Sequence, residues 1–212
     1  MYKYYLFDLD GTLLDTLDDL ADSVNVALTA YGLPNRERKE IRAFLGNGMK
    51  NLLTRAVGDR TEFFDDVFAY FKKHYTAHCA DKTKLYDGME ETLRQLKARG
   101  ARCAVVSNKA DFAVQMLAKE YFGDLVERSI GENEAIGIMR KPSPDTVLAV
   151  MKEFGAKKEE TVYIGDSEID IQTAKNAGVD CVCVTWGFRD REYLIENGAS
   201  VLVDEPKEIL LL

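Results

Sequence analysis

From Asp87 onward the chain alternates between helical and strand-like patterns, and this alternation restricts the fold more than any other feature. Short apolar runs that read as strands are expected at residues 102–106, 125–130, 161–164, 181–184 and 200–203. Amphipathic helices are expected between them, at residues 87–99, 112–121, 143–154 and 169–177. Such alternation is typical of a parallel sheet with helices on both faces. The apolar run Tyr4–Phe7 has no strand-like neighbour nearby in the sequence, so we place it in the same sheet of an α/β fold.

The segment between this first run and the alternating region is helical throughout. Apolar residues recur at helical spacing, and helices are expected at residues 17–31, 36–45, 50–57 and 62–78. No part of the segment alternates like a strand. We therefore expect residues 17–84 to form an inserted helical domain, and residues 1–16 and 85–212 to form the core. The two crossings, Thr16-Leu17 and Lys84-Leu85, are hinge candidates.

Two carboxylates follow the first strand-like run, in the sequence Asp8-Leu9-Asp10-Gly11-Thr12. Side chains alternate along an extended chain, so Asp8 and Asp10 project to one side. Gly11 permits a sharp turn, and Thr12 supplies a hydroxyl group. Two carboxylates at this separation repel each other, which predicts either a bound divalent metal or one protonated carboxyl group.

Further polar clusters follow other strand-like runs, where open α/β sheets bind their ligands. Ser107-Asn108-Lys109 is expected to open a helix and to offer a hydroxyl, an amide and helical N–H groups to an oxyanion. Lys141-Pro142 precedes another helix. Asp166 ends a buried run in Gly165-Asp166-Ser167-Glu168-Ile169-Asp170, and Asp170 follows one helical turn later on the same face. Together with Asp8 and Asp10 this all-oxygen set suits Mg²⁺ and offers no soft ligand for zinc or copper.

The bulk composition restricts the partners of the chain. A net charge of -8 and a pI of about 5.0 argue against nucleic acid and anionic membranes, which require a basic face. No run approaches the ~18 apolar residues of a membrane span, and Met1 leads straight into a strand rather than a signal peptide, so we expect a cytoplasmic protein. The four cysteines lack metal-knuckle spacing and are expected to be small buried thiols, at Cys79, Cys103, Cys181 and Cys183. The composition leaves open whether the chain is a monomer or a homodimer.

In these four motifs, taken in order, the chain resembles the haloacid dehalogenase superfamily. It is most similar to the phosphoglycolate-phosphatase-like branch, which carries a helical cap after the first motif. The similarity covers nearly the whole chain. The resemblance implies a Rossmann-like core, dependence on Mg²⁺, and phosphoryl transfer from a small phosphorylated metabolite through an aspartyl-phosphate.

The resemblance also assigns roles, which the chemistry of the side chains supports. Asp8 would attack phosphorus, and Asp10 would protonate the leaving alkoxide and then deprotonate water. Mg²⁺ would be held by Asp8, the backbone carbonyl of Asp10, and Asp166. Phosphoryl oxygens would be bound by the remaining polar residues of the motifs, Thr12, Ser107, Asn108 and Lys141, of which Lys141 also neutralises charge. Asp170 would orient Lys141 or water molecules without itself contacting the phosphoryl group.

Selectivity for the leaving group is expected to come from the cap. Arg42, Asn47 and Lys50 surround Gly46-Asn47-Gly48, which resembles the cap loop of the phosphoglycolate phosphatases, so Arg42 and Asn47 are candidates to contact the substrate. His74 and His78 are four residues apart, but no acidic partner follows as in HExxH. We interpret these histidines as part of a surface helix face.

Several related activities remain to be separated. Dehalogenases of the superfamily lack an acid at the second Asp position, so Asp10 argues against halide displacement. Asp10 also disfavours a phosphonate hydrolase, for which Lys50 would be the Schiff-base candidate. A sugar phosphomutase of the β-phosphoglucomutase type keeps both aspartates and is only weakly disfavoured by Thr12. A non-catalytic phosphate-binding regulator is disfavoured because the nucleophile, the acid and Lys141 are all present. The sequence therefore predicts a Mg²⁺-dependent phosphatase that acts on a small phosphomonoester.

Overall fold

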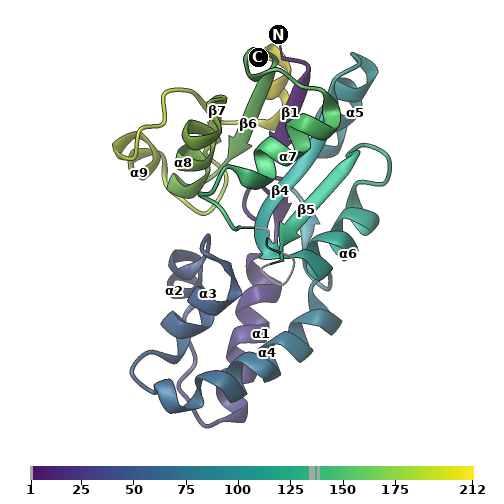
Figure 1. Ribbon diagram of the computed structural model, residues 1–212. Helices are drawn as coiled ribbons and strands as arrows, with labels where there is room; N and C mark the ends of the chain where they lie inside the picture. Colours follow the sequence, from purple (N-terminus) through teal and green to yellow (C-terminus); the bar gives the residue numbers. More distant parts are fainter. Residues whose placement is uncertain (1, 134–136, 138) are drawn as a thin grey trace.

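The fold is built around a parallel six-stranded sheet, seen in the computed structural model of Figure 1, which describes residues 2–133, 137 and 139–212. The strand order is β5-β4-β1-β6-β7-β8, and each neighbouring pair is parallel. The strands are β1 (Tyr4–Phe7), β4 (Arg102–Ala110), β5 (Arg128–Glu132), β6 (Thr161–Gly165), β7 (Asp180–Val184) and β8 (Leu202–Val203). The predicted α/β class is confirmed, and β1 lies at the centre of the sheet, as expected for a fully apolar run.

Helices cover both faces of the sheet. They are α5 (Met89–Ala98), α6 (Asp111–Tyr121), α7 (Asp145–Phe154), α8 (Glu168–Ala177) and α9 (Arg191–Glu196). Alternate residues of β1 enter different clusters: Tyr5 and Phe7 pack with α5 and α6, whereas Leu6 packs with α7 and α8. Short 3₁₀ turns lie in the core at Lys158–Glu160 and Pro206–Leu211, and in the inserted segment at Thr61–Phe63.

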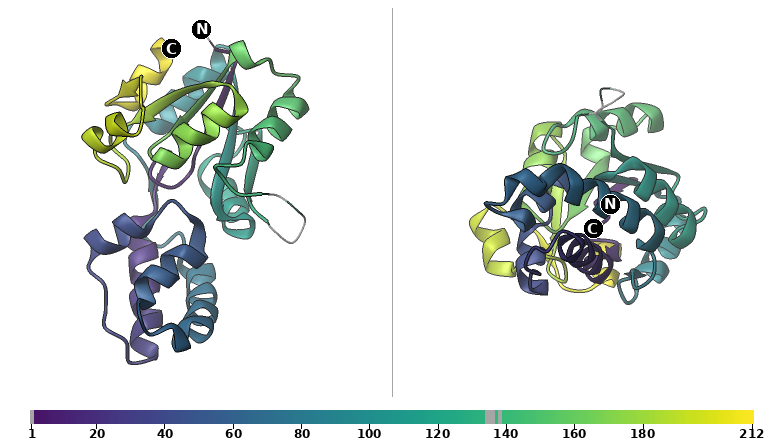
Figure 2. Two further views of the ribbon diagram at one scale, coloured as in Figure 1. Left: turned by 60° about the vertical axis from the view of Figure 1, so that its left-hand side comes forward. Right: turned by 90° about the horizontal axis from the view of Figure 1, so that it is seen from below.

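The inserted segment forms four helices that gather beyond one end of the sheet (Figures 1 and 2). They are α1 (Leu17–Ala30), α2 (Arg38–Phe44), α3 (Gly48–Val57) and α4 (Phe64–His78). Apolar residues of α1 and α4 that are fully buried hold the four helices together, among them Val24, Leu28, Val67 and Phe71. None of the helices in the described ranges is long and apolar enough to cross a membrane.

A two-stranded antiparallel ribbon lies at the crossings between the inserted helices and the core. Leu14 of β2 (Leu14–Asp15) pairs with Leu85 of β3 (Lys84–Leu85). The sequence predicts no strand here, because two residues are too few to establish a period of two. The ribbon brings the two hinge candidates side by side.

The largest differences from the sequence predictions concern β4, β5 and α9. Ser107-Asn108-Lys109 does not open a helix, because β4 continues to Ala110, where it still pairs with Glu132 of β5. That pairing also moves β5 later in the chain than predicted, and α9 has no counterpart in the prediction. The error has a physical reason, since polar side chains end the apolar run that marks a strand although the backbone remains extended.

All four cysteines are free thiols, and three of them are buried as expected, whereas Cys181 is partly exposed.

Candidate active site

Strand order brings the predicted motifs together at one edge of the sheet. Asp8 follows β1, Asp166 follows β6, and Ser107 lies in β4, so the three come from neighbouring strands. The backbone N–H of Asp8 donates to the carbonyl of Ile164 at 2.8 Å, which continues the ladder by one residue beyond β1. The backbone that carries the first carboxylate is therefore fixed to the sheet through its N–H group.

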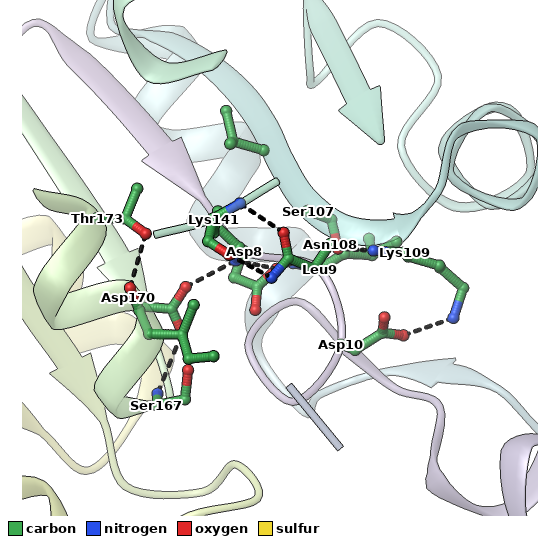
Figure 3. A network of polar contacts seen from close by, with 12 residues as sticks. Asp8, Leu9, Asp10, Ser107, Asn108, Lys109, Lys141, Ser167, Asp170 and Thr173 are labelled. Carbon is green, nitrogen blue, oxygen red and sulfur yellow. Dashed lines mark hydrogen bonds and ion pairs between the residues drawn. The ribbon is translucent and has the colours of Figure 1, made fainter. Parts of the chain in front are cut away.

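Lys141 lies between two of the carboxylates (Figure 3). Its Nζ atom is 2.9 Å from Asp8 Oδ1 and 2.7 Å from Asp170 Oδ1, and only 3% of the side chain is exposed. Nζ also donates to the Tyr163 hydroxyl at 3.1 Å. Burial opposes the charged form, but attraction by Asp170 and Asp8 outweighs it and raises the pKa of Lys141 well above its ordinary value. Lys141 is therefore a cation at neutral pH.

Asn108 holds the backbone of Lys141. Its Oδ1 accepts from the Lys141 N–H at 2.7 Å, and its Nδ2 donates to the Lys141 carbonyl at 3.1 Å and to the carbonyl of Gly46 at 3.1 Å. Both N–H bonds of the amide are thereby engaged. The predicted phosphate ligand Asn108 thus joins the core to the inserted helices in this structure, whereas Ser107 lines the cavity and its hydroxyl oxygen accepts from the N–H of Lys109 at 3.2 Å.

Asp8, Asp166 and Asp170 form a buried acidic cluster, in which carboxylate oxygens lie within 4.8 Å of one another. Burial, together with repulsion from Asp170 and Asp10, raises the pKa of Asp8 to about 7, although Lys141 opposes the shift. Burial and repulsion from Asp170 and Asp8 raise the pKa of Asp166 well above its ordinary value. The cluster brings three carboxylates together, two of them in contact with Lys141, and the all-oxygen donors fit a hard divalent cation such as Mg²⁺.

Asp170 differs from the other two carboxylates because the protein already occupies both of its oxygens. Oδ1 accepts from Lys141 and Tyr163, at 2.7 and 3.2 Å. Oδ2 accepts from the N–H of Asp166 at 3.2 Å and from the Ser167 hydroxyl at 2.6 Å. This arrangement favours the predicted role of Asp170 in orienting Lys141 over direct metal ligation.

Two glycines, Gly11 and Gly187, leave room for the carboxylate of Asp166 because they lack side chains. A Cβ atom on Gly11, whose φ is +82°, would lie 2.3 Å from Asp166 Oδ2, and one on Gly187 would lie 2.5 Å from the same oxygen. The N–H of Phe188 donates to that oxygen at 2.6 Å. Gly11 therefore serves two purposes, since it permits both the left-handed turn and the close approach of the carboxylate.

Asp10 lies apart from the acidic cluster and has different partners. Its Oδ1 accepts from the Thr16 hydroxyl at 2.6 Å and from Lys109 Nζ at 2.7 Å. Lys109 is 5% exposed and lines the same cavity as Asp10. The sequence places Lys109 beside Ser107 and Asn108 but gives it no role, because the contact with Asp10 spans 99 residues.

The other predicted ligands lie farther from the cavity. Thr12 is fully buried, and its hydroxyl finds no hydrogen-bond partner among the described residues. Arg42 donates to the carbonyl of Gly187 at 3.0 Å and to Asp190 at 3.1 Å, and the Asn47 carbonyl accepts from Asn51. None of the three predicted ligands is part of the cavity wall formed by the described residues.

Arg189, which the sequence analysis does not single out, lines the cavity from the loop after β7. Its guanidinium donates to Glu168 at 3.1 Å and to the carbonyls of Leu45 and Arg42, at 2.9 and 3.4 Å. These two carbonyls lie at the C-terminal end of α2, where a cation is favoured. Arg189 and Arg42 thus form a reciprocal clasp, in which each donates to the backbone of the segment that carries the other.

The histidine pair on α4 lies away from this site. His74 Nδ1 is 3.0 Å from the Ser23 hydroxyl, and His78 Nδ1 is 2.8 Å from Asp81. Within the described ranges, neither belongs to a group of three or more side chains that could hold a metal. The predicted surface helix face agrees with the exposure of His78, whereas His74 is partly buried.

The cavity itself is small and lies between the sheet edge and the inserted helices. Its volume is about 50 Å³, which is room for a few water molecules or one phosphoryl group. Asp8, Asp10 and Asp166 form one wall, and apolar residues of the inserted segment such as Leu20 and Leu52 form the opposite wall. The arrangement places a nucleophile candidate, an acid candidate and the buried cation Lys109 around one small cavity.

Known proteins share both the sequence pattern and this architecture. The family model described as haloacid dehalogenase-like hydrolase matches residues 5–184. The chain is 32% identical to a phosphoglycolate phosphatase of Pseudomonas syringae pv. syringae over 216 residues, which is 98% of this chain and 78% of that protein. It is 34% identical to a phosphoglycolate phosphatase of Colwellia psychrerythraea over 216 residues, with 97% and 94% covered. The structure of a predicted phosphoglycolate phosphatase from Haemophilus somnus superposes with a TM-score of 0.91 at 30% identity, with 99% and 97% covered. The chain belongs to the haloacid dehalogenase-like hydrolase family.

Proposed function

We propose that this hydrolase is a Mg²⁺-dependent phosphatase that cleaves a small phosphomonoester through an aspartyl-phosphate on Asp8. The observation that carries the proposal is the position of Asp8, whose carboxylate lies 2.9 Å from the buried Lys141 cation and inside the acidic cluster. The buried cation can neutralise a bound phosphoryl group, and the carboxylate cluster can hold a metal beside the nucleophile. The names of the similar proteins, phosphoglycolate phosphatases, support the same reaction class.

In this proposal Asp8 attacks phosphorus in line and forms the covalent intermediate. Lys141 neutralises charge on the phosphoryl oxygens, and the Ser107 hydroxyl in the cavity wall donates to one of them. Mg²⁺, when bound by Asp8, the Asp10 carbonyl and Asp166, supplies positive charge that offsets repulsion between nucleophile and phosphate. Without such a cation the raised pKa of Asp8 would keep part of the nucleophile protonated at neutral pH.

Asp10 serves the two proton transfers. It protonates the leaving alkoxide in the first step and accepts a proton from the attacking water in the second. Asp10 lines the cavity and stands apart from the acidic cluster, with its Oδ1 atom bound by Thr16 and Lys109. Asp8 and Asp10 can therefore take different roles, because Asp8 contacts Lys141 whereas Asp10 contacts Thr16 and Lys109.

The volume of the cavity supports a small substrate. About 50 Å³ accommodates a phosphoryl group and little else while the inserted helices are packed on the core. We therefore propose that residues 17–84 act as a cap that moves on the β2–β3 ribbon to admit substrate, with residues 1–16 and 85–212 as the catalytic core. The clasp of Arg42 and Arg189 then holds the closed position.

The leaving group is proposed to be small and polar, in the manner of phosphoglycolate or a sugar phosphate. Arg189 brings positive charge to the cavity wall, which favours an anionic leaving group such as the carboxylate of phosphoglycolate. The mutase alternative differs in product, because it would interconvert a sugar phosphate without releasing phosphate.

Phosphate release from a panel of small phosphate esters, with and without EDTA, tests the proposal. We expect Mg²⁺-dependent release, an Asp8→Asn variant without measurable turnover, and a Lys119→Met control on the exposed face of α6 with normal turnover. Full activity of Asp8→Asn against p-nitrophenyl phosphate would disprove the nucleophile assignment. Conversion of a sugar phosphate without phosphate release would favour the mutase.

A further inference from the structure

Lys109 is a buried cation that the proposed reaction does not yet use. We propose that Lys109 is a positioning residue that fixes the carboxylate of Asp10, and that Tyr75 of the cap helix α4 holds Lys109 in place. This inference rests on the proposed phosphatase activity, and in particular on Asp10 as the acid and base. It adds a residue from the core and one from the cap to the machinery of proton transfer.

The contacts of Lys109 join three parts of the chain. Its Nζ atom lies 2.7 Å from Asp10 Oδ1, and the side chain is only 2% exposed. The same ammonium lies 4.8 Å from the centroid of the Tyr75 ring, and Tyr75 is fully buried on α4. A cation over an aromatic face is attracted by the ring, most strongly where water is excluded. Lys109 is therefore held between the acid and the cap.

Two donors converge on one oxygen of Asp10. The Thr16 hydroxyl and Lys109 Nζ both bind Oδ1, at 2.6 and 2.7 Å. Two fixed donors from different directions restrict rotation about the Cβ–Cγ bond, so the position of Oδ2 is also determined. An acid that must reach first a leaving oxygen and then a water molecule depends on such restriction, because a small misplacement costs much of its efficiency.

The charge of Lys109 is stable in this position. Burial disfavours the ammonium, but attraction by Asp10 and by Tyr75 outweighs burial and raises the pKa of Lys109 above its ordinary value. A buried ammonium without its carboxylate would be strongly unfavourable, so the two groups hold each other in the cavity wall.

The backbone of β4 explains how Lys109 reaches this point. Alternate residues of a regular strand point to opposite faces, yet three consecutive residues here serve one site. The pairing of β4 with β5 is irregular between Val106 and Ala110, which frees Ser107, Asn108 and Lys109 from strict alternation. Ser107 lines the cavity, Asn108 binds Lys141, and Lys109 binds Asp10.

Leaving groups of different basicity separate positioning of the acid from a general structural role. An alkyl phosphate needs a proton on its alkoxide, whereas p-nitrophenolate leaves without one. For Lys109→Met, we expect kcat/KM toward glycerol phosphate to fall by about 10- to 100-fold, since general acids contribute about 10²–10⁴-fold and the acid itself remains. The loss with p-nitrophenyl phosphate is expected to be at least tenfold smaller, and Lys119→Met should show neither loss.

Two further comparisons sharpen the test. In the Asp10→Asn background, Lys109→Met should cause no additional loss with the alkyl ester, because the group it positions is gone. Tyr75→Leu removes the ring beneath the ammonium and should lower the alkyl-to-aryl ratio of kcat/KM, whereas Tyr75→Phe keeps the ring face and should preserve that ratio. Thermal unfolding of each variant identifies any that fail to fold, and the Tyr75 pair then decides the question.

The outcomes that would overturn the inference are distinct. Equal losses for alkyl and aryl esters would assign Lys109 a general structural role. A loss confined to an alkyl ester that carries a carboxylate, such as phosphoglycolate, would make Lys109 a substrate ligand instead. An additive loss in the Asp10→Asn background would also contradict positioning. Failure of the proposed function looks different, because the wild-type protein would then release no phosphate from either ester.

Discussion

The acidic cluster predicts that the metal-free protein is destabilised as the pH rises, and that replacing Asp8 by asparagine removes this effect. Asparagine has the shape of a protonated aspartic acid but cannot ionise. The experiment therefore compares the free energy of unfolding of the wild-type protein with that of Asp8→Asn, in the presence of EDTA, between pH 4.5 and 8. The difference between the two proteins reports the cost of ionising Asp8, together with its effect on the titrations of Asp166 and Lys141.

The magnitude follows from the pKa of Asp8, which burial raises from its ordinary value of 3.8 to about 7. The folded state then binds more protons than the unfolded state between these two values. Stability from this group is complete below about pH 4 and is lost as the pH rises through 7. At roughly 1.4 kcal/mol for each pKa unit, the loss is on the order of 4 kcal/mol.

Urea unfolding at each pH measures the difference directly. We expect the two proteins to be similar near pH 4.5 and Asp8→Asn to be more stable by up to about 4 kcal/mol at pH 8. Mg²⁺ should reverse the order at pH 8, because only the wild-type protein keeps the full set of metal ligands. A stability gap that does not change with pH, or a wild-type protein that gains nothing from Mg²⁺ at pH 8, would refute this reasoning.

Three further substitutions test other parts of the site. Asp170→Asn should cost about 3–5 kcal/mol in urea unfolding, because it removes the main partner of the buried Lys141; a loss below 1 kcal/mol would mean that this pair contributes little to stability. Gly11→Ala should weaken Mg²⁺ binding about 10- to 100-fold by calorimetry, because its Cβ would collide with Asp166; unchanged affinity would contradict the proposed metal site. Arg189→Gln should raise KM about tenfold, a change of about 1.4 kcal/mol, by loosening the clasp; an unchanged KM would exclude a role in cap closure.

The sequence predicts those parts of the site that follow from local pattern and strand order. Asp8 and Asp166 end apolar runs, and parallel strands bring such ends to one edge of the sheet, so their proximity follows without a structure. Asp170 lies one helical turn beyond Asp166, which places it on the same face. Lys141 lies in a loop, where no periodic pattern marks it, and the family resemblance assigns its role.

The remaining features depend on contacts between residues far apart in the chain. The role of Lys109 depends on its contact with Asp10, which is 99 residues away in the sequence. The polar residues at the end of β4 also interrupt the apolar pattern that marks a strand, so the sequence does not predict that β4 extends through Lys109. Arg189 follows the last long strand and meets the inserted helices only in the folded chain. Conversely, Thr12 belongs to the first motif and Arg42 lies near the predicted cap loop, yet neither lines the cavity. Thr12 is fully buried, and Arg42 donates to the carbonyl of Gly187.

Trapping the covalent intermediate tests the central claim most directly. Borohydride reduces an aspartyl-phosphate to homoserine, and mass spectrometry of proteolytic fragments locates the changed residue. With enzyme quenched during turnover of a small phosphate ester in Mg²⁺, we predict homoserine at position 8 and none in a sample treated with EDTA. Phosphate release without modification at Asp8, or homoserine at another aspartate, would contradict the proposed mechanism.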